Sequence, residues 1–322
     1  MELINQGKVK DVYALDDDTL IFDFSDRISV FDQIIPSKIP RKGEALNRES
    51  AFWFEKVAGM GIKTHYIDTP KPNRMKVKRV RVIHDYDRLT KDLTDYQIPL
   101  ECVLRWYCAG SFYKALQTGR KKPEDFGLDH MPEYGEKLPE PFFEVTTKFE
   151  HVDRKLDRAE ALEISGLTED ELDGIKDICI RIDEMMQEEV GKRGLIHVDG
   201  KKEFAMDADR NIMLIDTFGT ADEDRWWDAE QYAQGNIIEF SKEFVRKYYE
   251  NDVIYNCPSC GTGSCSCSCE PGECTFSYKE FLDKLREDGK PQVGIPPLPQ
   301  DMIDKTAKLY ADLFQRITGR PF

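Results

Sequence analysis

The 322-residue chain lacks any apolar run long enough to cross a membrane, and its first residues contain no apolar stretch of signal-peptide length. The chain has fewer basic than acidic residues: 46 Lys and Arg compared with 61 Asp and Glu, which gives a formal net charge of −15. Such a charge opposes binding to nucleic acids and to anionic membranes. We therefore expect a cytoplasmic protein whose partners are small molecules, not nucleic acid or membrane, with homo-oligomerisation left open.

Cysteines are sparse outside one segment. Six of the nine lie between Cys257 and Cys274, and the other three sit in apolar contexts typical of reduced core residues: Cys102, Cys108 and Cys179. A chain-wide disulfide framework is therefore not expected. The two-residue spacing of Cys257 and Cys260 fits a structural Zn²⁺ site, and a reduced surface insertion is the equal alternative. The thiols available to such a site are Cys257, Cys260, Cys265, Cys267, Cys269 and Cys274.

The first part of the chain predicts short strands and one helix. Residues 9–13 and 19–24 form strands on either side of a turn of three aspartates, and residues 75–83 alternate as a half-exposed strand. Apolar side chains fall on one helical face over residues 44–58, and glycines follow. These elements indicate the start of an antiparallel sheet packed against a helix.

The remainder predicts a larger lobe with mixed elements. A capping box at Thr168 begins a long amphipathic helix that ends near Gly191. The other predictions are a strand at 100–107, a surface loop at 121–141, a strand at 195–198, a hairpin of 201–206 with 211–216, a long helix at 226–249 and a terminal helix at 301–317.

Together these patterns predict an α+β fold in two lobes. A polar stretch at 84–97 marks the junction. We expect an N-terminal, mainly antiparallel lobe over 1–97 and an α/β lobe over 98–322, which includes the cysteine-rich insertion 257–274.

The predicted hairpin carries the clearest chemical signal. Strand alternation places Asp199, Lys201 and Glu203 on one face, and the turn position sets Glu203 opposite Ile215 or Asp216. Two carboxylates so close are unfavourable unless a cation separates them, and Mg²⁺ takes carboxylates together with nucleotide phosphates. A Mg²⁺-ATP site is one interpretation. A solvated face with Glu203 paired to a neighbouring lysine is the other.

Three further groups of residues suggest an anionic substrate. Gly7, Lys8 and Lys10 fit a phosphate-binding turn, although an edge strand has the same pattern. Glu101 and Arg105 project from an apolar strand, and they could equally form a structural pair. Other candidates are Ser111, which begins a helix, and Asp222 with Arg225, where an arginine can clamp a phosphate or pair with an aspartate.

Taken in order, these motifs resemble the SAICAR synthetase family. The resemblance runs through GKVKDVY, SDRISVFDQIIPSKIPRKGEALNRES, ECVLRWYCAGS, TTKFEHVD, HVDGKKEFAMD and IDTFGTADEDRWW. It implies a two-lobed fold related to kinase and ATP-grasp architectures, with ATP in the cleft between the lobes. The cysteine-rich insertion lies outside the resemblance.

The resemblance also implies roles for individual residues. ATP and Mg²⁺ are assigned to Gly7, Lys8, Lys10, Glu203 and Asp216, with Glu101 near a second Mg²⁺. Lys201, Lys148 and Asp153 are expected catalytic residues. Substrate contacts are assigned to Ser25, Asp26, Arg27, Lys42, Glu101, Arg105, Ser111, Asp222 and Arg225.

The implied reaction is an ATP-dependent ligation in purine biosynthesis. ATP activates the carboxylate of carboxyaminoimidazole ribonucleotide as an acyl phosphate, and the amine of L-aspartate then attacks it to form a C–N bond. Phosphoryl transfer of this kind needs charge neutralisation and alignment and no protein nucleophile. The alternatives are a kinase-like phosphotransferase, suggested by the echo of a kinase motif at Asp216-Thr217-Phe218-Gly219, and a zinc-binding interaction module.

Overall fold

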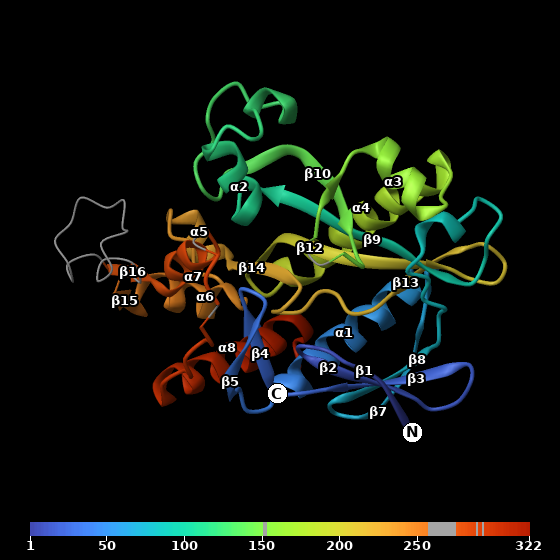
Figure 1. The fold of residues 1–322 in the computed structure, drawn as a ribbon, viewed down its shortest axis with the longest axis horizontal. Coiled ribbons are helices and arrows are strands. Elements are labelled where there is room, and N and C mark those ends of the chain that lie inside the picture. Colours follow the sequence, from blue (N-terminus) through green and yellow to red (C-terminus); the bar gives the residue numbers. More distant parts are fainter. Residues whose placement is uncertain (151–152, 257–274, 288, 292) are drawn as a thin grey trace.

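A computed structural model describes residues 1–150, 153–256, 275–287, 289–291 and 293–322 (Figure 1). Two sheets organise these residues. In Figure 1 the strands of the first part of the chain lie at the lower right and the larger sheet lies above them, with the first helix between the two. Among the described helices, none combines the length and apolar character that a membrane span requires.

The smaller sheet has five antiparallel strands in the order β1-β2-β3-β8-β7. Their bounds are β1 Glu2–Gln6, β2 Lys10–Ala14, β3 Thr19–Phe24, β7 Tyr66–Lys71 and β8 Arg74–Lys78. The two predicted N-terminal strands are confirmed, and the third predicted strand ends at Lys78, before its expected end. A hairpin of β4 (Arg27–Val30) and β5 (Gln33–Lys38) follows β3.

Helix α1 (Lys42–Gly59) packs against this sheet and confirms the predicted helix. Its apolar face is fully in the core, with Trp53, Phe54 and Val57 at 0% exposure. Such large buried side chains each contribute about 1.5–3 kcal/mol of transfer free energy. Burial of this apolar face therefore holds α1 against the smaller sheet.

The larger sheet has seven strands, in the order β11-β10-β9-β12-β13-β6, with β14 paired to β12. Their bounds are β6 Lys63–Thr64, β9 Tyr96–Tyr107, β10 Lys137–Thr147, β11 Lys155–Leu156, β12 Leu195–Met206, β13 Ile212–Ile215 and β14 Asp224–Asp228. All pairs in it are antiparallel except β13 with β6. Through β6, the first part of the chain joins the larger sheet.

Helices cover this sheet and its ends. They are η1 Tyr86–Arg88, α2 Gly110–Gln117, η2 Pro123–Phe126, α3 Arg158–Ser165, α4 Glu169–Gly191, α5 Ala229–Ala233 and α6 Glu243–Asn251. Helix α4 packs on β12 and β9. The predicted capping box at its start is present, because the Thr168 side chain accepts from the Glu171 N–H and the Glu171 carboxylate accepts from the Thr168 N–H.

Two predicted segments are wrong. Residues 121–141, expected as a loop, contain η2 and the first part of β10. The long helix expected at 226–249 is instead strand β14 followed by the separate helices α5 and α6. The helix was predicted because Trp226 and Trp227 fit the apolar face of an amphipathic helix. Both side chains are instead fully buried in a strand that pairs with β12.

The last described elements are β15 Ile254–Asn256, β16 Thr275–Ser277, α7 Tyr278–Glu287 and α8 Gln300–Thr318. Helix α8 confirms the predicted terminal helix and returns to pack on α1. The cysteines predicted as a zinc site, Cys257 to Cys274, lie outside the described residues. The structure therefore does not test that prediction.

Candidate active site

A cavity of about 580 Å³ is lined by both sheets. Nine of the residues predicted from sequence line it: Gly7, Lys8, Lys10, Glu101, Lys148, Asp153, Lys201, Asp216 and Asp222. Residues to which the sequence analysis assigned no site role also line it, among them Asp32, Glu150, Thr217, Thr220 and Glu223. Segments nearly 220 residues apart along the chain thus share one cavity.

Three carboxylates meet where β9, β12 and β13 lie side by side. Glu203 of β12 lies opposite Glu101 of β9 on one side and opposite Ile215 of β13 on the other. Asp216 follows Ile215 directly. The predicted hairpin register is therefore confirmed.

Lysines neutralise these carboxylates. Lys148, which follows β10, donates to Glu203 at 2.6 Å and to Glu101 at 3.0 Å. Lys201 lies 2.9 Å from Glu101 and 3.2 Å from Glu203. From the smaller sheet, Lys10 donates to Asp216. The cavity therefore alternates anionic and cationic groups instead of concentrating one sign of charge.

Burial and these neighbours shift the pKa values in opposite directions. Burial raises the pKa of Glu203, and the nearby charges of Asp216 and Glu101 raise it further against the pull of the lysines. For Asp216, burial also acts to raise the pKa, but Lys10, Lys148 and Lys201 outweigh it and lower the pKa. Glu203 is therefore the carboxylate most easily protonated, and Asp216 holds its charge.

The turn before β2 is shaped by its backbone. The Gly7 N–H donates to the Lys10 carbonyl at 2.9 Å, and a Cβ at position 7 would stand only 2.8 Å from that oxygen. Only glycine fits here without a shift. Lys8 pairs with the exposed Asp32 at 2.6 Å, so both predicted lysines of this turn lie at the cavity.

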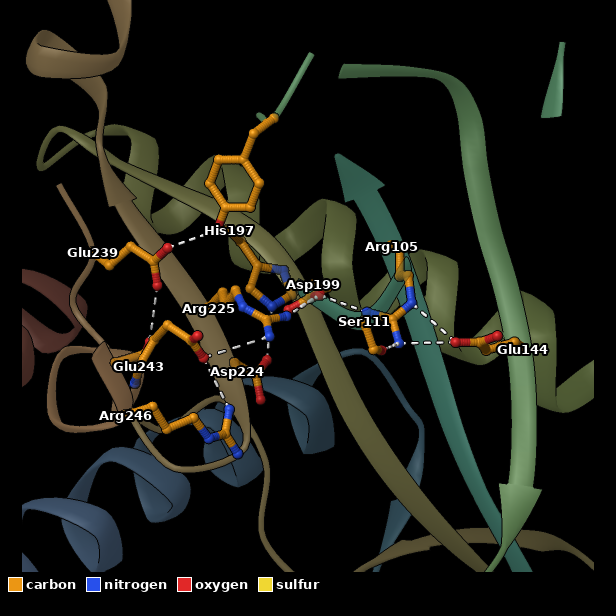
Figure 2. Close-up of polar contacts among 12 residues, drawn as sticks. Arg105, Ser111, Glu144, His197, Asp199, Asp224, Arg225, Glu239, Glu243 and Arg246 are labelled. Carbon is orange, nitrogen blue, oxygen red and sulfur yellow. Dashed lines mark hydrogen bonds and ion pairs between the residues drawn. The ribbon is translucent and has the colours of Figure 1, made fainter. Parts of the chain in front are cut away.

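A second polar network lies beside the cavity, and Figure 2 shows it. Arg105 donates to Asp199 at 2.8 Å, and Arg225 donates to the same carboxylate oxygen at 2.5 Å. Ser111 lies 3.5 Å from Arg105, and Glu144 accepts from Arg105 at 2.8 Å. Among the described residues, Glu101 and Arg105 do not form the structural ion pair that was the alternative interpretation of the sequence. Glu101 pairs with lysines, and Arg105 pairs with Glu144 and Asp199.

Besides Arg105, Ser111 and Arg225 of this network, four more predicted substrate residues lie outside the cavity lining. Asp26 accepts from the Gly43 N–H at the start of α1, and Arg27 pairs with Asp11 at 2.5 Å. Ser25 donates to the Val9 carbonyl at 2.8 Å. Lys42 is fully buried, and its ammonium lies 2.7 Å from Asp222, which does line the cavity. These residues thus connect the segment around the Gly7 turn to α1 in this structure.

Sequence reasoning missed a buried network behind the cavity. Lys202 pairs with Asp183 of α4, and the His197 ring lies 2.7 Å from Asp224. All four side chains are at most 3% exposed. A signal was present: Lys202 must point away from the Lys201 and Glu203 face, and Asp183 falls within the apolar stripe of the α4 sequence.

The cavity fits a cation only in combination with another ligand. No group of three or more His, Cys, Asp or Glu side chains stands ready to hold a metal among the described residues. Glu203 and Asp216 supply oxygen donors suited to Mg²⁺, which commonly uses one or two carboxylates and completes its coordination with substrate phosphates and water. The lysines around them suit the same phosphates.

Comparisons with known proteins place the chain in one family. A family model described as SAICAR synthetase matches residues 3–256. The chain is 49% identical over 320 residues to a phosphoribosylaminoimidazole-succinocarboxamide synthase of Thermoplasma acidophilum, with 99% of each chain covered.

Two solved structures share the α+β fold. The SAICAR synthase from Saccharomyces cerevisiae complexed with SAICAR superposes with a TM-score of 0.67 at 24% identity, covering 99% of this chain and 95% of that one. A SAICAR synthetase in complex with ADP gives a TM-score of 0.65 at 24% identity, covering 99% and 98%. At this identity the two structures establish the fold alone. With the family model and the full-length relative, they lead to one conclusion: the chain belongs to the SAICAR synthetase family.

Proposed function

We propose that this chain joins L-aspartate to carboxyaminoimidazole ribonucleotide at the expense of ATP, giving SAICAR, ADP and phosphate. Family membership over the full length supports this reaction. One structural observation carries the assignment to a site. Glu101 and Asp216 line a cavity, Glu203 lies buried beside them, and Lys10, Lys148 and Lys201 pair with these three carboxylates.

This arrangement suits phosphoryl transfer because the lysines can exchange carboxylate partners for phosphate oxygens. We assign the ATP phosphates to the turn of Gly7 and Lys8 and to Lys10, with Glu203 and Asp216 as the carboxylates for Mg²⁺. Mg²⁺ bound there supplies charge that neutralises the phosphate oxygens.

The ribonucleotide is assigned to the neighbouring network. Arg105 and Arg225 both hold Asp199, so their guanidinium groups converge, and Ser111 stands at the start of α2 beside them. Two arginines and a hydroxyl can bind a phosphate through several hydrogen bonds. The carboxylate of the substrate then lies toward Glu101 and Lys201.

The chain contributes positioning and electrostatics to the reaction. The substrate carboxylate attacks the γ-phosphorus of ATP, and the bond to the ADP oxygen breaks to leave an acyl phosphate. The aspartate amine then forms the C–N bond and phosphate departs. Lys148 and Lys201 offer ammonium groups to the developing negative charge, which is the main catalytic demand of both steps.

We also propose that the two lobes divide near residue 97. All five strands of the smaller sheet come from residues 1–97, and β9 begins the larger sheet at Tyr96. Strand β6 is the exception, because it lies within the first part of the chain and pairs with β13.

The test is ADP release by the purified full chain with each substrate omitted in turn. We expect ADP only when ATP, Mg²⁺, carboxyaminoimidazole ribonucleotide and L-aspartate are all present, together with stoichiometric SAICAR. ADP formation that is indifferent to aspartate would instead favour the kinase-like phosphotransferase.

A further inference from the structure

A second cavity, of about 470 Å³, lies between β10, β11 and the first turns of α3 and α4. It shares no lining residue with the active-site cavity. Nothing in the ligase chemistry described above uses it. Its walls come from the segment at 141–145 and from residues of two helices that begin close together in sequence.

Its lining is cationic in a strongly acidic chain. Four basic side chains face two carboxylates, and apolar groups complete the wall. The basic residues are Lys121, Lys155, Arg158 and Lys176, the acids are Glu144 and Asp173, and the apolar residues include Phe142, Phe143, Leu156 and Leu172. A local surplus of positive charge attracts anions even when the whole molecule is negative.

The surplus is concentrated around Glu144. One of its carboxylate oxygens lies 2.9 Å from Lys155 and 3.8 Å from Lys121, while the other accepts from Arg105 at 2.8 Å. Three cations thus share one carboxylate. Burial lowers the pKa of Lys121, and the charges of Lys155 and Arg105 act the same way against the attraction of Glu144.

We propose that this second cavity binds a small phosphate-bearing anion and that Glu144 couples its occupancy to Arg105 of the ribonucleotide site. An anion in the cavity takes Lys121 and Lys155 as partners. Glu144 already accepts two hydrogen bonds from Arg105 (Figure 2). Once it loses its lysine partners, it holds Arg105 more tightly. The coupling rests on the proposed role of Arg105, and it predicts weaker binding of the ribonucleotide when the cavity is filled.

Equilibrium dialysis of the full chain with labelled inorganic phosphate tests the site. The double variant Lys155→Ala/Lys176→Ala removes two of its cations. Lys305→Ala/Lys308→Ala on α8 is the matched control, because both lysines are exposed and the change in net charge is identical. We expect the cavity variant to lose about tenfold or more in affinity at one phosphate site and the control to bind as wild type. Equal phosphate binding by both variants overturns the proposal.

A parallel titration with phenyl phosphate identifies the source of the phosphate group. Tighter binding of the ester than of inorganic phosphate indicates an organic phosphate whose ring packs on the apolar part of the lining. Equal binding indicates free phosphate. In either case, the affinity must depend on Lys155 and Lys176, or the site is refuted.

The coupling has its own readout. We expect phosphate to raise the KM for carboxyaminoimidazole ribonucleotide about fivefold more in wild type and in the α8 control than in the cavity variant. Dialysis needs no turnover, so a failed ligase assay would leave the binding result intact. A KM response that is identical in all three proteins would overturn the coupling through Glu144.

Discussion

Lys148 bridges Glu101 and Glu203, two carboxylates that lie opposite each other on neighbouring strands. Its ammonium is 3.0 Å from the first and 2.6 Å from the second, and the Glu203 side chain is only 1% exposed. Without a cation between them, two such carboxylates repel each other strongly, because little solvent screens them.

Replacing Lys148 by methionine is therefore expected to lower the free energy of unfolding by about 2 kcal/mol, which is less than for a fully buried pair because Lys148 is partly exposed. Added Mg²⁺ should restore part of this loss, since the cation takes the place of the ammonium. Urea unfolding at increasing Mg²⁺ concentrations measures both effects. Lys8→Met, which removes a lysine that pairs with the exposed Asp32, is the control. A Lys148→Met protein that does not respond to Mg²⁺ would contradict the bridging role.

Glu203→Gln and Asp216→Asn are each expected to lower kcat/KM for ATP by about a hundredfold or more while the fold is retained, because each removes a negative charge from the proposed metal site. Asparagine is the appropriate replacement at position 216, since Asp216 has a φ of 61° and asparagine tolerates that conformation better than alanine. Steady-state kinetics and circular dichroism provide the two readouts. Near-normal turnover in both variants would refute the assignment.

The buried pair of Lys202 and Asp183 yields a prediction about stability. Lys202→Met leaves Asp183 charged in the core, and we expect a loss of about 3–5 kcal/mol in the free energy of unfolding. The double replacement Lys202→Met/Asp183→Leu should recover most of that loss, because no charge remains unpaired. Chemical denaturation tests this, with the exposed pair Lys308→Met/Asp312→Leu as the comparison. Additive losses in the double variant would exclude the pairing argument.

His65 predicts how stability depends on pH. Burial lowers its pKa to about 3, although Asp216 partly opposes this, so the folded protein keeps the ring neutral. The unfolded chain takes up this proton below about pH 6.5. Stability from this group is therefore complete above pH 6.5 and falls by up to about 1.4 kcal/mol per pH unit until about pH 3.

Unfolding free energies of wild type and His65→Gln between pH 4 and pH 8 check this prediction. The variant should lose that slope. Parallel pH profiles for wild type and His65→Gln would disprove the assignment to His65.

Local patterns predicted much of the fold. Alternation along β12 and the position of its turn were enough to place Glu203 beside Asp216, because the partner strand β13 is only a few residues away. The capping box of α4 and the apolar face of α1 are equally local. The roles of the predicted site residues remain predictions, including those that the structure gathers around one cavity.

Contacts between residues far apart in the chain could not be predicted from the sequence. Glu144 accepts from Arg105 across 39 residues, and only the first part of the strand that carries it, up to residue 141, was expected to belong to a loop rich in proline and charge. The tryptophans of β14 have the same apolar character in a helix or a strand, and only the pairing with β12 decides between them. Similarly, nothing local distinguishes Lys42 as a buried side chain that pairs with Asp222.

The alternation of side chains along β12 makes insertions and deletions within this strand unfavourable. Lys201 lines the cavity and Glu203 lies on the same side of the strand, paired with Lys148, whereas Lys202 between them reaches Asp183 on α4. Inserting or deleting one codon within this strand would exchange the two sets and place Glu203 against the helix. We therefore expect length changes between homologues in the turn at 207–210 and not within 199–203.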